Sequence, residues 1–384
     1  FGSSLAQELL TEWHMMDAPD ATAWLFCVLG SVSMGTYPAP IKAPAVRKAA
    51  VHPLVFQCYK SFWVFASGFV FIAFNLIRGL PAYVFTYWGL LGAAAWIPSG
   101  LGTIASVSRL GVGTAAVVNT GTSASFQFLV GQLVGETMKK HGPPGREYML
   151  APYYLVLVIL GMAGLVLSPG LNCRRRRPAS EPHAVQLTDG NADGPLSQTR
   201  QLADVATSRL DMAIGLSCAV AAGLFSALQY GLISIGKKIE SGKIHCTDCP
   251  ERHRFNNEFD PFGSYMTSFG IGTGLMTSLY LGGFMSAAKY RGECMPKSHF
   301  NVLRVPGSLA GWCWVIGNVF QSAAISRGGS SVMGPSNQAA QLIASGMWGL
   351  LYYREVRDPR RIFCWVCFAA WTVTFVILLG REKQ

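Results

Sequence analysis

The two halves of this chain carry related sequences. When the sequence is displaced by 218 positions, residues of the same type fall on one another in the same order. The aligned pairs are Trp96 with Trp314, Arg109 with Arg327, Gly111 with Gly329, Asn119 with Asn337 and Gly131 with Gly349. Each half also contains five long apolar stretches. Because five is odd, the two copies must cross a membrane in opposite directions, which is the inverted repeat of secondary transporters.

Composition places the chain among membrane proteins. Hydrophobic residues make up 51% of it and charged residues 13%, against roughly 25% charged residues in a soluble domain. About 20 apolar residues cross the hydrocarbon core as a helix, which satisfies its own backbone hydrogen bonds. We therefore expect an all-α polytopic membrane protein with ten transmembrane helices in a 5+5 inverted repeat. The predicted spans are 21–39, 53–77, 84–107, 110–134, 148–169, 211–235, 261–288, 303–325, 328–352 and 360–380.

The domain order follows from these spans. Residues 1–20 contain acidic but no basic residues, unlike the start of a signal peptide, and from Phe1 we expect that the chain begins inside a longer product or after processing. The polar stretch between the halves should be a disordered linker. The predicted order is a polar tail over 1–20, the first repeat over 21–169, a basic and polar linker over 170–209, the second repeat over 210–380 with a Cys/His-containing loop at 237–260, and a tail over 381–384.

The net charge of +11 does not indicate nucleic-acid binding. The basic residues flank apolar segments in short loops, which is typical of membrane proteins. Loops that follow odd-numbered spans hold more Lys and Arg, chiefly because of Arg174–Arg177, and this favours a cytosolic central linker. Which membrane holds the protein stays open.

The chain has ten cysteines, six of them inside predicted spans, where Cys packs as a small hydrophobe. Cys246 and Cys249 share a loop with His245 and His253. These four could bind zinc in a Cys₂His₂ site, and a CxxC disulfide or free thiols are the alternatives. No cofactor and no catalytic cysteine is expected.

Polar side chains inside the spans mark the candidate transport path, because intramembrane polar groups usually face the bundle interior or a water-filled cavity. Asn119 and Ser123 share a helix face, and Asn337 and Gln341 share one in the matching span. Such groups can bind a hydroxyl-rich solute without an intramembrane charge; hydrogen bonding between helices is the alternative. The first candidates are Asn119, Ser123, Asn337, Gln338 and Gln341, and the second group is Gln229, Asn318 and Gln321.

Four further side chains are candidates on other grounds. Lys60 lies about two turns inside the second span, where it could bind an anionic group in a cavity or snorkel to the membrane surface. Tyr37, Trp96 and Trp314 could stack on a sugar or base face, although aromatic residues in apolar helices are most often packing.

The sequence lacks the common enzyme motifs. It contains no GxxxxGK[ST] phosphate loop, no HExxH and no GxSxG. ATP-driven pumping and enzymatic catalysis are therefore not expected. Carboxylates are nearly absent from the predicted spans, so a carboxylate proton relay has little support, while proton coupling through groups near the loops stays open.

Several short motifs, taken in order, resemble the drug/metabolite transporter superfamily. Gly35-Thr36, Pro40-Ile41-Lys42 and Phe56-Gln57 are similar to the first signature of the eukaryotic transmembrane protein 144 family, a branch similar to bacterial glucose and rhamnose uptake proteins. The stretch 260–278 resembles the seventh helix of that family. Met347-Trp348-Gly349 through Glu355 resembles its ninth-helix ending, with Arg354 in place of the usual Lys, and the sixth span lacks the proline of the first signature.

The resemblance implies carbohydrate transport and leaves proton coupling open. We therefore expect a secondary transporter that moves a small polar solute, foremost a sugar, by alternating access. An amino-acid or other metabolite exporter of the same fold is the first alternative. A structural or assembly subunit of the membrane that does not transport is the second.

Overall fold

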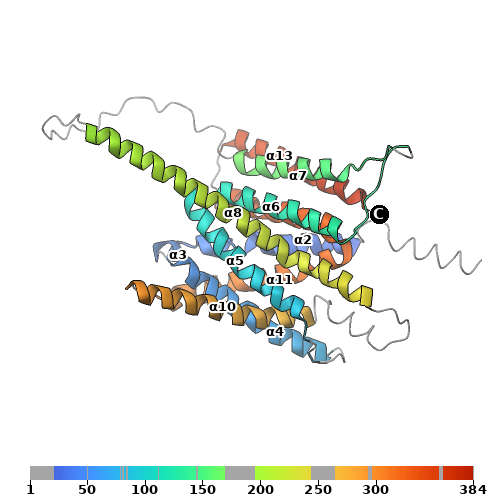
Figure 1. Ribbon diagram of the computed structural model, residues 1–384, viewed down its shortest axis with the longest axis horizontal. Coiled ribbons are helices and arrows are strands. Elements are labelled where there is room, and N and C mark those ends of the chain that lie inside the picture. Colours follow the sequence, from blue (N-terminus) through green and yellow to red (C-terminus); the bar gives the residue numbers. More distant parts are fainter. Residues whose placement is uncertain are drawn as a thin grey trace, which may run out of the picture.

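A computed structural model describes residues 21–49, 51–77, 79, 82–83, 85–110, 112–143, 146–168, 195–243, 264–292, 296–353 and 358–383. Over these residues the chain is helical, with only two isolated β-bridges (Figure 1). The long helices are α2 (Ala21–Thr36), α4 (Pro53–Ile77), α5 (Tyr87–Leu110), α6 (Val112–Leu133), α7 (Ala151–Leu167), α8 (Pro195–Lys243), α10 (Ser264–Arg291), α11 (Phe300–Gly328), α12 (Ser330–Met347) and α13 (Pro359–Arg381). The short elements are η1 (Ala39–Lys42), α3 (Pro44–Lys48) and a π-helix, η3 (Trp348–Tyr352).

Three of these helices are long and apolar enough to cross a membrane. They comprise Leu54–Ile77 in α4, Leu210–Gly236 in α8 and all of α13, with mean hydropathies of 1.6, 1.7 and 2.4. Helices α2 and α7 are apolar but shorter. Large apolar side chains such as Phe62 and Phe363 are exposed on the outside of the bundle, as lipid contact requires. The prediction of an all-α, multi-pass membrane protein is thus confirmed for the described residues, whereas the ten spans and the inverted repeat stay predictions.

Three element boundaries differ from the predictions. Helix α8 begins at Pro195, inside the linker expected to be disordered, because proline suits the first helical turn and residues 196–210 contain no glycine or further proline. The same helix extends to Lys243, so the first part of the expected 237–260 loop is helical. The predicted span 328–352 divides into α12 and the π-helix Trp348–Tyr352.

The helices pack in a recurring pattern. Helix α5 packs on α8 and α10, and α11 packs on α2 and α4. Helix α6 packs on α8 and α12, and α12 also packs on α2. In Figure 1, α7 and α13 lie together at one edge of the bundle, and α4 and α10 lie together at the opposite edge. The remaining helices, α2, α5, α6, α8, α11 and α12, lie between these two edges.

Small residues let the central helices approach closely, as is common in membrane bundles. At Gly35 of α2, an added Cβ would lie 2.5 Å from Cβ of Ala344 in α12. At Gly223 of α8, it would lie 2.6 Å from the Asn119 carbonyl oxygen in α6. Any side chain at either position would therefore separate two helix backbones.

Candidate functional site

Lys60 lies in the interior of the bundle, enclosed by aromatic rings. Its side chain is only 5% exposed. Its ammonium nitrogen lies 4.8 Å from the Trp96 ring centroid, 5.2 Å from that of Tyr37 and 5.8 Å from that of Trp314. These distances suit cation–π attraction. Of the two orientations that the sequence left open for Lys60, the structure has the inward one and not the snorkelling one.

Among the described residues, no carboxylate pairs with Lys60. The ion pairs of that part of the chain are Lys140 with Glu147, His141 with Glu382 and Arg361 with Asp358. A buried ammonium without a counter-ion is unfavourable, because ring faces attract it but do not neutralise its charge. Lys60 is therefore a buried basic group whose described neighbours are aromatic rings and not carboxylates.

The rings around Lys60 belong to a larger aromatic cluster. The Trp96 and Trp314 centroids lie 4.3 Å apart. Phe269 of α10 lies 6.0 Å from Trp96 and 5.8 Å from Trp314. Tyr265 stacks on Phe269 at 6.2 Å. This cluster joins α5, α10 and α11 at the level of Lys60.

A network of amides and tyrosines continues from this cluster. Nε2 of Gln229 donates to Oδ1 of Asn318 at 2.8 Å, and the Tyr230 hydroxyl donates to Oε1 of Gln321 at 2.8 Å. The Tyr265 hydroxyl donates to the carbonyl of Gln229 at 3.4 Å. Trp314, Asn318 and Gln321 follow one another at helical spacing, so they lie on one face of α11. The second group of predicted residues therefore forms a connected unit with the aromatic cluster.

Two amide donors in this network lack a conventional acceptor. Among the described residues, Nε2 of Gln321 is buried without a hydrogen-bond partner. Nδ2 of Asn318 donates only to the weak sulfur acceptor of Met266, at 3.6 Å. Because a buried polar group without a partner is costly, these donors are candidate contacts for a solute or for water.

A second polar area lies between α6 and α12. Nε2 of Gln127 donates to the Ser123 hydroxyl at 2.9 Å, and its Oε1 has no partner among the described residues. Asn337 is 1% exposed, and neither atom of its side-chain amide has a partner there. Its backbone carbonyl accepts a hydrogen bond from Ser31 of α2. The Asn337 amide is therefore a second candidate contact for a polar solute.

The remaining predicted residues are distributed differently. Asn119 is half-buried, and its Nδ2 donates to Oγ1 of Thr103 at 2.9 Å. Gln338 is buried and Gln341 is half-buried. Asn119 thus makes a helix-to-helix hydrogen bond, in contrast with Asn337, its counterpart in the repeat.

The proposed zinc ligands lie outside the described residues. These are Cys246, Cys249, His245 and His253. In the part of the chain that the structure describes, no group of three or more His, Cys, Asp or Glu side chains could hold a metal ion. The six cysteines placed in spans are free thiols there.

Several residues of the site were not singled out from the sequence. Gln127 follows Ser123 at i+4, so the helical spacing that selected Ser123 also indicates Gln127. The Tyr230 and Tyr265 hydroxyls hydrogen-bond to the amide network, a role that no sequence pattern indicated. No pattern in the sequence indicated Glu136.

Glu136 joins the loop after α6 to the start of α12 and so closes this end of the bundle. Its carboxylate accepts hydrogen bonds from the backbone nitrogens of Ser330, at 2.7 Å, and Ser331, at 2.9 Å, and from the Ser331 hydroxyl. It therefore caps the N-terminus of α12, where a negative charge is favourable. Nearby, Nζ of Lys383 donates to the Gly328 carbonyl at the end of α11, at 2.7 Å.

The C-terminal residues complete this closed end. Oε2 of Glu382 lies 2.7 Å from Nε2 of His141, and the Glu382 carbonyl accepts from the backbone nitrogen of Lys139. Burial lowers the pKa of Lys383, and the Glu136 carboxylate acts in the opposite direction. The loop after α6 and the end of α13 are thus tied to the α11–α12 turn.

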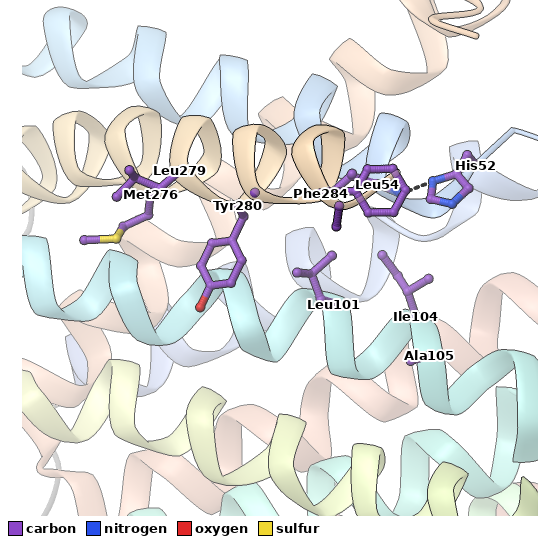
Figure 2. Close-up of a pocket in the computed structure, with 11 residues that line it drawn as sticks. His52, Leu54, Leu101, Ile104, Ala105, Met276, Leu279, Tyr280 and Phe284 are labelled. Atoms are coloured by element: carbon purple, nitrogen blue, oxygen red, sulfur yellow. Dashed lines mark hydrogen bonds between the residues drawn. The ribbon is translucent and has the colours of Figure 1, made fainter. Parts of the chain in front are cut away.

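A cavity of 780 Å³ lies elsewhere, between α4, α5 and α10 (Figure 2). Figure 2 shows Leu279, Tyr280 and Phe284 of α10 across from Leu101 and Ile104 of α5. Its lining is apolar, which suits a hydrocarbon chain and offers little to a polar solute. The polar cluster around Lys60 and Gln321 is therefore the better candidate site.

Comparisons with known proteins add information about the fold only. No family model matches the chain, and no curated protein matches it. One solved structure, described only as the crystal structure of a protein, superposes with a TM-score of 0.52 at 14% sequence identity, over 94% of this chain and 99% of that chain. At this identity the likeness shows a shared fold across nearly the whole chain and does not indicate a function.

Proposed function

We propose that this protein is a secondary transporter that moves a small polar solute, foremost a carbohydrate, by alternating access. The observation that carries the proposal is the contact between Trp96 and Trp314 beside Lys60 and the amide network. These two residues are equivalent in the sequence repeat. In inverted-repeat transporters the solute site lies where the two repeats meet.

The helix packing supports ten spans in a 5+5 inverted repeat. The sequence repeat pairs α2 with α8, α4 with α10, α5 with α11, α6 with α12 and α7 with α13. If each helix is replaced by its equivalent in the other half, a contact between two helices should recur between their equivalents. The contact of α5 with α8 then corresponds to that of α11 with α2, the contact of α6 with α8 to that of α12 with α2, and the contact of α5 with α10 to that of α11 with α4. All six contacts are present. The pairs α4–α10, α6–α12 and α7–α13 also pack together, as expected for elements beside a two-fold axis.

The chemistry of the site supports a polar solute with a ring. Amide and hydroxyl groups donate to and accept from solute hydroxyls, and an indole face packs against the apolar face of a sugar ring. The resemblance to the transmembrane protein 144 family of the drug/metabolite transporters points to the same solute class. In this proposal no cofactor takes part, catalysis is absent, and the central linker lies on the cytosolic side.

Uptake into proteoliposomes tests the proposal. Purified full-length protein is reconstituted, and entry of radiolabelled glucose and rhamnose is compared with entry of radiolabelled alanine. We expect saturable sugar uptake that Gln321→Leu reduces and that Ser278→Ala, a change at an exposed hydroxyl bonded within its own helix, leaves unchanged. Saturable alanine uptake alone would favour an amino-acid exporter. Sugar and alanine entry equal to that of protein-free liposomes would favour a structural subunit.

A further inference from the structure

We propose that the transported solute carries an anionic group, a carboxylate or a phosphate, that pairs with the ammonium of Lys60. This inference rests on the proposed transport function and specifies its solute class. It makes the cluster of Lys60, Tyr37, Trp96 and Trp314 the anion-binding part of the site.

The first argument is the charge of the cluster. Lys60 is 5% exposed and is surrounded by three rings within 5.8 Å of its ammonium nitrogen. No described carboxylate forms an ion pair with it. In the protonated form of Lys60, cation–π attraction holds the ammonium in place but leaves its positive charge uncompensated. An anionic solute would neutralise it, whereas a neutral sugar would not.

The second argument is the kind of hydrogen-bonding group left without a good partner. On the face of α11 that carries Trp314, Nε2 of Gln321 has no partner among the described residues, and Nδ2 of Asn318 has only the Met266 sulfur. Both are donors, and the Lys60 ammonium offers donors only. The amide oxygens on this face are already occupied, by Gln229 and Tyr230. Carboxylate and phosphate oxygens accept hydrogen bonds, so an anionic group matches this excess of donors.

The position of Lys60 also suits the coupling of solute binding to alternating access. Its neighbours Trp96 and Trp314 come from equivalent places in the two halves. An ammonium at this junction contacts both halves through their indole rings. An anion that binds Lys60 would therefore act on the interface that must rearrange during alternating access.

The test uses three hexoses with the same ring: glucose, glucuronate and glucose 6-phosphate. Each is titrated into the full-length protein in detergent while the melting temperature is followed, since a ligand that binds only the folded state raises it. We expect glucuronate or glucose 6-phosphate to stabilise the protein at lower concentration than glucose. A preference for glucuronate identifies a carboxylate as the anionic group, and a preference for glucose 6-phosphate identifies a phosphate.

Two variants of Lys60 separate binding from structure. Lys60→Met should weaken the anionic hexose by about 10- to 100-fold, as expected for the loss of one charge-assisted hydrogen bond, and Lys60→Arg should retain the preference for the anion. Without ligand, Lys60→Met should melt at the same or a higher temperature, because it removes an uncompensated buried charge. Lys289→Met, at an exposed position of α10, is the matched control and should bind like the wild type.

The possible results differ in what they overturn. If glucose binds as tightly as both anionic hexoses, and Lys60→Met changes none of the three, the anion inference is wrong while sugar transport stands. If Lys60→Met lowers the melting temperature and keeps the anion preference, Lys60 is a packing residue and the inference is also wrong. If no hexose binds or enters proteoliposomes, the inference and the proposed carbohydrate transport fail together.

Discussion

The indole rings of Trp96 and Trp314 lie 4.3 Å apart between centroids, with their planes inclined by 37°. The two residues align when the halves of the sequence are superimposed. In an object with two-fold symmetry, a residue close to the axis contacts its own copy. This is the contact expected of the proposed inverted repeat if its axis passes beside these indoles and Lys60.

This contact predicts that the two tryptophans act together. Trp96→Phe and Trp314→Phe should each lower the free energy of unfolding. The loss in the double variant should be smaller than the sum of the two single losses by about 0.5–1.5 kcal/mol, the range for aromatic pairs. Thermal unfolding of the purified variants measures this coupling. Pairing Trp96→Phe with Trp312→Phe, on the exposed side of α11, is the control and should be additive. Additive losses for Trp96 and Trp314 would show that the indoles are energetically independent.

Glu136 is predicted to stabilise the closed end of the bundle. Glu136→Gln removes the negative charge at the start of α12 and weakens three hydrogen bonds, so we expect a loss of about 1–2 kcal/mol. Thermal unfolding again provides the measurement. Glu147→Gln, which removes an exposed pair with Lys140, should cost about 0–1 kcal/mol. Equal effects of the two changes would contradict the capping role.

Close packing of α2 on α12 predicts that Gly35 does not tolerate a side chain. Gly35→Ala would bring Cβ to 2.5 Å from the Ala344 Cβ and 2.8 Å from the Gln341 carbonyl oxygen, and such overpacking should cost about 1–3 kcal/mol. Gly282 of α10 is the matched control, because a Cβ there would meet nothing within 4 Å. Gly282→Ala should be neutral or stabilising by about 0.4–1 kcal/mol. If both changes are neutral, the α2–α12 contact is looser than the structure has it.

Two buried asparagines are predicted to respond in opposite ways. Asn318 accepts a hydrogen bond from Gln229, so Asn318→Leu should destabilise the protein by about 1–3 kcal/mol because it leaves the Gln229 donor without a partner. Asn337 has no side-chain partner among the described residues, so Asn337→Leu should be neutral or stabilising in the absence of solute. Sugar uptake by the Asn337→Leu variant should nevertheless fall, because the variant lacks the amide proposed to contact the solute. A large loss of stability in Asn337→Leu would mean that the amide is structural.

Much of the helical fold was predictable, because long apolar stretches in a membrane protein leave the helix as the simplest structure. The start of α8 at Pro195 was not predicted, because the polar composition of the whole 170–209 stretch suggested disorder. Residues 196–210 contain no glycine or further proline that would interrupt a helix. The π-helix at Trp348–Tyr352 was missed as well. Its sequence, Trp-Gly-Leu-Leu-Tyr, is apolar like the α-helical spans of this chain, so hydrophobicity alone does not distinguish a π-helix from an α-helix there.

The site was predictable in part. The expectation that polar side chains inside spans face the bundle interior agrees with the burial of Gln229, Asn318 and Asn337. The sequence did not decide whether Lys60 points inward, because a lysine two turns from a helix end can reach the surface or the interior. Its orientation depends on the indoles of two other helices, and such a contact follows from tertiary packing alone.

Alternating access is tested most directly by distances between spin labels at the two ends of the bundle. Labels are placed on exposed residues in a background without native cysteines, at Ile77 and Leu133 for the end that Glu136 closes, and at Tyr290 and Leu351 for the other end. Pulsed electron paramagnetic resonance is recorded with and without a transported sugar. We predict opposite changes, with one pair moving apart as the other moves together. Distances that stay fixed in both pairs under every condition would contradict alternating access and favour a structural role.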